Sequence, residues 1–304
     1  MPTHLVSADG MRLFVDERGA AGAPPVLFIH GGPGQSAFFF TRFQIDHLAA
    51  NTRVFAVDQR GLLRSDPLPE GTTVSVDAVI ADFETIREHL GIEAWTIVGH
   101  SAGGHTAARY ATEHPAAVNG VVLDCPALDT DLTDRHRLPI AARLLDEIGE
   151  HDAAEQCRAL AARPERLTAD DKSYEPMLRL GKRYNELFFA SQTHIDAHDT
   201  AQDEAGFSDA DWARGATHLA LLPDMYRPLF DLFPTPQPSL LVHGRHDLVA
   251  APAVIEHYRE RATNGGVHTF PDSAHFPYIE EPGAYAAVVS RFAAAAHAGT
   301  DPHA

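Results

Sequence analysis

Cysteine is scarce in this chain of 304 residues, and long apolar runs are absent. The two cysteines, Cys125 and Cys157, are too few for a disulfide framework, so we expect reduced thiols. No apolar run reaches the roughly 18 residues that a membrane-crossing helix needs. Residues 1–11 lack the basic stretch and the following apolar stretch of a secretory signal. These absences favour a cytoplasmic protein with no membrane partner.

Basic residues are also in deficit. Lys and Arg number 24 against 42 Asp and Glu, so the formal net charge is −18 at pH 7. Binding to nucleic acids and to anionic membranes depends on clustered Lys and Arg, so we expect neither partner. The acidity is typical of a soluble chain and is compatible with a cationic substrate.

The hydrophobic pattern alternates short strands with helices. A chain of this length can bury a large core without disulfides or metals. In the first half we expect strands at 12–16, 26–30, 54–58, 95–98 and 118–123, with helices at 39–49, 76–90 and 102–114. Such alternation predicts an α/β fold with a mostly parallel sheet covered by helices on both faces.

This alternation stops near Cys125 and Pro126. The pattern then becomes helical and polar, with helices expected at 138–148, 153–162, 176–189 and 210–221. Strands resume at 240–243 and 267–270. A helix is expected between them at 252–261, and a last helix at 282–296. We therefore expect a core of residues 1–126 and 234–304, interrupted by a helical cap, or lid, at 127–233.

The clearest chemical signal is Gly99-His100-Ser101-Ala102-Gly103, a G-x-S-x-G motif between an expected strand and an expected helix. In that context the tight turn lifts the serine hydroxyl above the end of the sheet. The N-terminus of the following helix favours negative charge at this point. We predict that Ser101 is a nucleophile; the alternative is a serine that only caps the helix.

A serine nucleophile needs a base, and in this motif context an Asp or Glu and then a His follow in the chain. Asp247 follows the expected strand at 240–243, and His275 follows the one at 267–270. We predict that His275 takes the proton of Ser101 and that Asp247 orients its imidazole. Asp124 is the alternative acid, or a buried carboxylate with a structural role.

Glycines after the strand at 26–30 can bring backbone N–H groups close to a substrate. The tetrahedral oxyanion of acyl transfer needs such donors, and we predict the N–H groups of Gly32, or its neighbour Gly31, and Ala102. The sequence His30-Gly31-Gly32-Pro33-Gly34 lacks the G-x-G-x-x-G spacing of dinucleotide binding. We expect no cofactor.

We also expect no metal. His194 and His198 are spaced for one helix face, but the Glu of H-E-x-x-H is absent. A Ser–His–Asp set activates its own nucleophile without an ion.

The motifs HGGPG at 30–34, DQRG at 58–61, GHSAGG at 99–104, GRHD at 244–247 and AHFP at 274–277 resemble the α/β-hydrolase superfamily. HGGPG with DQRG resembles its proline iminopeptidase group. The resemblance implies a serine aminopeptidase that removes an N-terminal residue, often proline, from a peptide or a small aminoacyl amide. It also implies that acidic residues of the cap hold the free α-ammonium. We interpret DQRG as structural, with an Asp–Arg pair orienting the loop at 30–34, which we call the oxyanion loop.

Three features differ from that group. His100 and Ala102 stand where its members have glycine and tryptophan, and Leu62 follows DQRG in place of a Gly-rich turn. The group's Glu-Asn-His-Tyr-Phe segment, whose Glu binds the amine, has its nearest match at 185–189, so the acid is either displaced to Glu186 or lost. Weaker candidates for the acid are Asp196, Asp199 and Glu204.

Aromatic residues supply further candidates for substrate binding. Phe38 and Phe39, beside Phe40 and Phe43, and Phe188 in the cap can form an apolar pocket wall or simply pack in the core. Two other functions stay open: a carboxylesterase or lactonase with the same catalytic residues, and a non-catalytic ligand-binding protein on the same fold. Dehalogenases and epoxide hydrolases are disfavoured because the motif holds serine and not aspartate.

Overall fold

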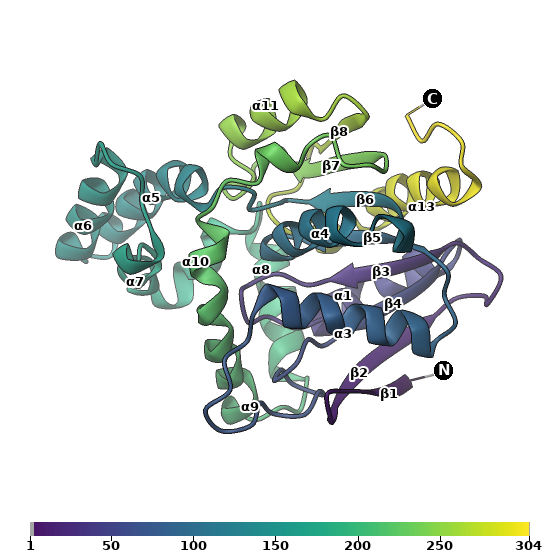
Figure 1. The fold of residues 1–304 in the computed structure, drawn as a ribbon. Coiled ribbons are helices and arrows are strands. Elements are labelled where there is room, and N and C mark those ends of the chain that lie inside the picture. Colours follow the sequence, from purple (N-terminus) through teal and green to yellow (C-terminus); the bar gives the residue numbers. More distant parts are fainter. Residues whose placement is uncertain (1–2, 304) are drawn as a thin grey trace.

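A single eight-stranded sheet organises the protein, in the order β1-β2-β4-β3-β5-β6-β7-β8 (Figure 1). The computed structural model describes residues 3–303, so Met1 and Pro2 of the N-terminal stretch considered above lie outside the described residues. The strands are β1 (Thr3–Ala8), β2 (Met11–Arg18), β3 (Pro25–Ile29), β4 (Arg53–Val57), β5 (Trp95–His100), β6 (Val118–Asp124), β7 (Ser239–Gly244) and β8 (Gly265–Phe270). Only the pairings of β2 with β1 and β4 are antiparallel, so the expectation of a mostly parallel sheet is confirmed.

Helices cover both faces of this sheet. Successive residues of β3 point to opposite faces, and all four from Val26 to Ile29 are fully buried. Leu27 and Ile29 pack in one apolar cluster with α3 (Val76–His89), α4 (Ala102–Glu113) and α11 (Pro252–Arg261). Val26 and Phe28 pack in another with α1 (Phe38–Phe43), α2 (Ile45–Ala49) and α13 (Pro282–Ala298). Strand β3 is therefore a continuous apolar run, because both of its faces are buried.

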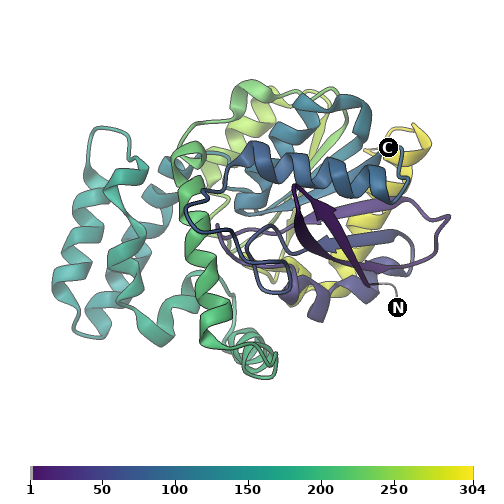
Figure 2. The same ribbon diagram turned by 60° about the horizontal axis from the view of Figure 1, so that its bottom comes forward.

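Between β6 and β7 the chain forms helices and loops without a strand; we call residues 125–238 the inserted helical segment. Its helices α5, α6 and α7 project beyond the carboxyl ends of the strands (Figures 1 and 2). The segment comprises α5 (Thr130–Glu147), α6 (His151–Ala162), η2 (Ala169–Asp171), α7 (Tyr174–Leu178), η3 (Gly181–Leu187), α8 (Gln192–Asp203), α9 (Asp209–Ala213), η4 (Arg214–Leu221), α10 (Leu222–Met225) and η5 (Phe230–Leu232).

Several helix boundaries differ from the sequence-based expectation. Helix α5 begins at Thr130 and not at Leu138, because the side chain of Asp129 accepts hydrogen bonds from the first free N–H groups of the helix. The helix expected at 39–49 is broken at Gln44, where φ is −125°. Those expected at 176–189 and 210–221 each divide into an α-helix and a 3-10 helix. The structure adds the short helix α12 (Pro277–Glu280).

Of the helices in residues 3–303, none combines the length and the apolar character that crossing a membrane requires.

Candidate active site

Ser101 occupies the turn between β5 and α4. Its backbone has φ +53° and ψ −120°, a conformation that a residue with a side chain rarely adopts. The turn closes only because its flanking residues are glycines: a Cβ on Gly99 would lie 2.4 Å from the carbonyl oxygen of Gly103. A Cβ on Gly103 would lie 2.3 Å from the carbonyl oxygen of Ile29. The tight turn therefore presents the Ser101 side chain at the carboxyl end of β5.

The loop after β3 lies directly against this serine. A Cβ on Gly31 would lie 2.7 Å from the Cβ of Ser101, so the two backbones meet at close range. Gly32 has φ +123°, a value that favours glycine. The N–H groups of Gly32 and Ala102 donate to no other atom of residues 3–303, and both residues line one pocket with Ser101. These N–H groups are free to stabilise negative charge on an oxygen beside Ser101.

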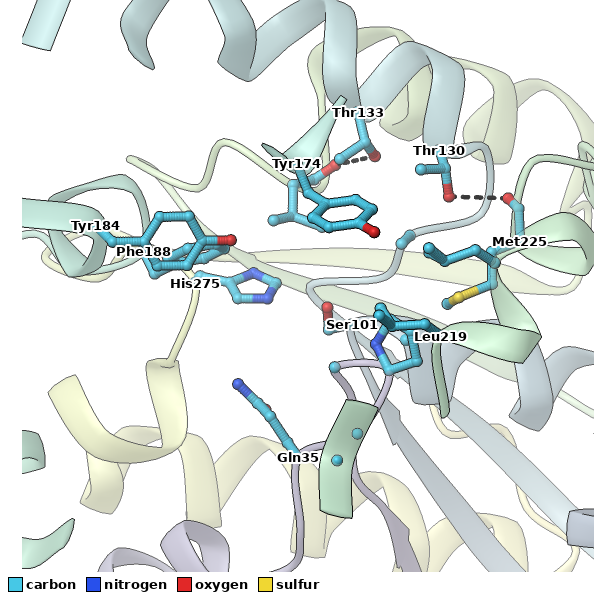
Figure 3. A pocket seen from close by; sticks show the side chains of 18 of the residues that line it. Gln35, Ser101, Thr130, Thr133, Tyr174, Tyr184, Phe188, Leu219, Met225 and His275 are labelled. Atoms are coloured by element: carbon cyan, nitrogen blue, oxygen red, sulfur yellow. Dashed lines mark hydrogen bonds between the residues drawn. The ribbon is translucent and has the colours of Figure 1, made fainter. Parts of the chain in front are cut away.

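Asp247 and His275 lie in two loops at the carboxyl ends of β7 and β8 and are hydrogen-bonded to each other. The distance from His275 Nδ1 to Asp247 Oδ1 is 3.0 Å, and both residues are buried. The N–H groups of Val249 and Ala250 also donate to the Asp247 carboxylate, at 2.9 and 3.1 Å. Nε2 of His275 has no partner in residues 3–303, and His275 lines the same pocket as Ser101 (Figure 3).

Burial and hydrogen bonding act in opposite directions on the pKa values of this pair. Burial lowers the pKa of His275, and the adjacent Asp247 carboxylate only partly offsets that shift. Burial alone would raise the pKa of Asp247, but His275 and the two backbone N–H groups together bring its pKa below the ordinary value. At neutral pH the pair is therefore a neutral imidazole held by an ionised carboxylate.

Asp124, the alternative acid, has other partners. Its Oδ2 lies 3.1 Å from Nδ1 of His100 and accepts the Tyr285 hydroxyl at 3.0 Å. It is fully buried at the end of β6. The His100 ring lies beside that of His275, with 4.7 Å between centroids, but Asp124 accepts no hydrogen bond from His275.

The DQRG motif supports the oxyanion loop in a way different from the expected Asp–Arg pair. Asp58 binds Arg64 and the N–H of Ala37, whereas Arg60 pairs with Asp82 of α3 at 2.6 Å. The expectation of pairing within the motif is therefore wrong, because each charge finds a partner elsewhere in the fold.

The contact to the loop is made by Gln59. Its side chain donates to the carbonyl of His30 at 3.2 Å, and its N–H donates to the imidazole of His30. Through Gln59 the motif fixes the first residue of the oxyanion loop.

A cavity of about 760 Å³ opens above Ser101. The core contributes the oxyanion loop, Ser101 and His275, and the inserted helical segment contributes most of the remaining walls (Figure 3). Its lining from the inserted segment includes Thr130, Thr133, Arg137, Ser173, Tyr174, Leu178, Tyr184, Asn185, Phe188, His198, Trp212, Leu219, Met225 and Tyr226. The volume suits a small molecule or a short peptide end.

Of the aromatic candidates, Phe39 and Phe188 line the cavity, and Phe38 does not. Phe39 stacks on His198 with 4.0 Å between ring centroids, and the Phe188 ring lies 5.5 Å from that of His275. Phe38 packs edge-on against Phe39, Phe207 and the cavity-lining Trp212.

Glu186 does not line the cavity. Both of its carboxylate oxygens accept hydrogen bonds from Arg183, at 2.6 and 2.9 Å, and this ion pair lowers the pKa of Glu186. Its charge is therefore already compensated at the surface. The weaker candidates are also elsewhere: Asp196 accepts from Gln192, Asp199 accepts from Asn185, and Glu204 is exposed. Within residues 3–303, no Asp or Glu lines this cavity.

Sequence reasoning missed Glu280, a positioning residue. Its buried carboxylate accepts the N–H of Ala274, next to His275, at 2.8 Å and the N–H of Ala190, in the inserted segment, at 2.7 Å. It therefore fastens the His275 loop to that segment. A carboxylate two residues before a helix-forming run carries no distinctive sequence signal.

One group of three potential metal ligands occurs in residues 3–303: Cys125, Asp247 and His275, whose ligand atoms lie within 4.8 Å of one another. Burial raises the pKa of the Cys125 thiol well above its usual range, so the thiolate that a metal needs is disfavoured. Asp247 and His275 already bind each other. Nδ1 of His194 contacts the Ser191 hydroxyl, and Nδ1 of His198 contacts the Asp199 carboxylate.

Comparison with known proteins places these features in context. The alpha/beta hydrolase fold family matches residues 24–282. A proline iminopeptidase of Heyndrickxia coagulans is 28% identical over 286 residues, covering 91% of this chain and 92% of that protein. Another, from Xanthomonas citri, is 29% identical over 264 residues, covering 79% and 80%.

Among solved structures, a proline iminopeptidase-related protein from Thermus thermophilus has a TM-score of 0.75 at 23% identity, covering 100% of this chain and 99% of its own. At that identity the likeness shows the fold.

Proposed function

The chain belongs to the α/β-hydrolase fold family, as its motifs suggested, and we propose that it is a serine hydrolase that cleaves an ester or amide bond through an acyl-enzyme on Ser101. One observation carries this proposal. A serine in a strained strand–turn–helix conformation shares a cavity with a histidine whose other nitrogen is bound to a buried aspartate.

The proposed catalytic steps follow from which atoms at the site have no hydrogen-bond partner. Because Nδ1 of His275 is held by Asp247, Nε2 is the nitrogen that receives the proton of Ser101 as the hydroxyl oxygen attacks the substrate carbonyl. The N–H groups of Gly32 and Ala102 then stabilise the oxyanion. His275 gives the proton to the leaving group, and the same sequence with water releases the acid and restores Ser101.

The relatives bring one candidate substrate class. Proline iminopeptidases are similar to this chain over most of its length, which favours an aminopeptidase that acts on a free N-terminal amine. An α-ammonium enclosed in a cavity needs an anion, because an unpaired buried charge is penalised by several kcal/mol.

The residues that line the cavity favour the other substrate class, esters or lactones that are bound without a free amine. No carboxylate in the described residues lines it, and the position nearest the group's amine-binding Glu is occupied by the amide of Asn185. We therefore propose that the substrate is a small ester, lactone or amide that is recognised without a free amine. In this proposal the inserted helical segment is the cap that closes over the substrate.

A paired substrate panel tests both levels of the proposal. Nitrophenyl esters are compared with nitroanilides of free and N-acetylated amino acids, for the wild type and Ser101→Ala. We expect Ser101-dependent hydrolysis of the esters and no preference for the free amine over its N-acetylated form. A strong free-amine preference would establish the aminopeptidase class, and activity retained by Ser101→Ala would exclude the serine mechanism.

A further inference from the structure

The one charged side chain in the described lining of the cavity is basic, although the protein as a whole is acidic. The chain carries a formal net charge of −18, yet Arg137 is the one Lys or Arg among the described cavity-lining residues, and no Asp or Glu lines the cavity. Within residues 3–303, the single permanently charged group that lines the cavity is therefore a guanidinium.

Helix α5 carries this arginine across the cavity. Thr130, Thr133 and Arg137 are three and four residues apart, so they share one face of the helix. The hydroxyls of Thr130 and Thr133 donate to the carbonyls of Met225 and Val249, at 2.9 and 2.7 Å (Figure 3). These bonds fix α5 above Ser101, and Arg137 lies about 10 Å farther along the helix than Thr130.

Asp134 holds the guanidinium in place from behind. Its Oδ1 accepts from Nε and Nη2 of Arg137, at 3.1 and 2.8 Å. Its Oδ2 accepts the hydroxyls of Tyr226, at 2.6 Å, and Ser173. Asp134 is itself 0% exposed, so all of its acceptor capacity is used inside the wall.

One nitrogen of the Arg137 guanidinium has no hydrogen-bond partner. Nη1 of Arg137 donates to no atom of residues 3–303. Some polar side-chain atoms of residues 3–303 are buried and have no hydrogen-bond partner, but Nη1 of Arg137 is not one of them. Nη1 therefore reaches accessible space, and the residue lines the cavity.

The guanidinium stays charged in this setting. Burial alone would lower the pKa of Arg137, but Asp134 and the neighbouring Tyr184 keep its pKa above the ordinary value. A partly desolvated guanidinium with free N–H donors binds a carboxylate strongly, because the two groups are planar and their donors and acceptors match.

We propose that Arg137 forms a carboxylate-binding subsite, so that the substrate of the serine hydrolase proposed above is an ester or amide that carries a carboxylate. The carboxylate accepts hydrogen bonds from Nη1 of Arg137 while the scissile carbonyl lies at Ser101. This substrate class rests on the proposed function, whereas binding of a carboxylate at Arg137 does not.

The kinetic test compares matched substrates. Mono-nitrophenyl adipate and suberate carry a free carboxylate on the acyl side, and acetoxybenzoate carries one on the leaving group; the control for each is its primary amide. The readout is the ratio of kcat/KM for acid over amide. In the wild type we expect at least one pair to show a ratio of about 30 or more.

The variants separate recognition from folding. Arg137→Gln alone would leave Asp134 buried and unpaired, so the double variant Asp134→Asn/Arg137→Gln removes both charges together. We expect its ratio to fall to about 1, and Arg137→Lys to keep part of the preference. Arg143→Gln, an exposed position on the same helix, should keep the wild-type ratio. An unchanged ratio in the double variant, or no acid preference in the wild type, would overturn the subsite.

A binding measurement distinguishes the two proposals. Hexanoate and hexanamide are titrated calorimetrically into the wild type, Ser101→Ala and the double variant. We expect hexanoate to bind the first two with similar affinity and the double variant at least about tenfold more weakly. If hexanoate binding weakens in the double variant but no turnover depends on Ser101, the serine hydrolase proposal is excluded and the carboxylate subsite is supported. Equal hexanoate affinity in all three proteins would exclude the subsite.

Discussion

Replacing Asp247 by asparagine keeps the imidazole of His275 but changes the hydrogen bond that orients it. The carboxylate of Asp247 accepts three hydrogen bonds, from His275 Nδ1 and from the N–H groups of Val249 and Ala250. An asparagine side chain has one acceptor oxygen and one donor nitrogen. The Val249 N–H and His275 Nδ1 share Oδ1, whereas the Ala250 N–H donates to Oδ2, so the one acceptor oxygen of the amide cannot serve both sides. With that oxygen at the Ala250 N–H, the NH2 group takes the Oδ1 position and faces Nδ1.

The imidazole then changes tautomer. Nδ1 becomes an acceptor, so the proton moves to Nε2, the nitrogen that must take the proton of Ser101. We expect kcat to fall by about 10⁴, equivalent to about 5.5 kcal/mol of transition-state stabilisation. The free energy of unfolding should fall by about 1–3 kcal/mol, from the mismatch at a buried site.

The assay is steady-state hydrolysis of a nitrophenyl ester, with thermal unfolding as a check on folding. Asp124→Asn is the matched control, since Asp124 is an equally buried carboxylate beside a different histidine. It should lose stability and keep most of its activity. A folded but inactive Asp124→Asn, together with an active Asp247→Asn, would refute this reasoning and make Asp124 the catalytic acid.

Three further outcomes follow from the same geometry. The value of kcat/KM should rise with pH and level off with a midpoint below 6.5, because burial lowers the pKa of His275 and only its neutral form accepts a proton; a pH–rate profile with a midpoint above 7 would contradict this. Gly31→Ala should reduce kcat by about tenfold or more, because its Cβ would meet Ser101 at 2.7 Å, whereas Gly22→Ala, with open space around it, should be neutral in the same assay. Glu186→Gln should leave KM unchanged for substrates with and without a free amine, because Glu186 is paired with Arg183 outside the cavity; a selective rise in KM for the amine would return it to the site.

Local sequence was sufficient for the parts of the protein that depend on local backbone geometry. The strand–Ser101–helix turn needs glycines at fixed offsets, and those offsets are visible in the chain. Apart from β1 and α12, which the sequence analysis did not predict, the order of strands and helices in the core followed from the apolar pattern. The positions of Asp247 and His275 after β7 and β8 followed from the same strand pattern.

The inserted segment was harder because its details depend on tertiary contacts. Helix α5 starts at Thr130 because of the Asp129 cap, which an apolar-periodicity argument overlooks. The Arg183–Glu186 pair has a spacing of three residues, a signal that could have excluded Glu186 as a free acid. The orientation of Arg137 toward the cavity depends on how α5 packs, and no local pattern reports it.

Covalent labelling shows whether Ser101 is the nucleophile. The protein is incubated with a fluorophosphonate, and the adduct is located by intact-mass and peptide mass spectrometry. We expect one phosphonyl group per chain, on the peptide that contains Ser101. Labelling should be strongly slowed in Asp247→Asn and absent in Ser101→Ala. Labelling at another residue, or hydrolytic activity that survives complete modification of Ser101, would contradict it.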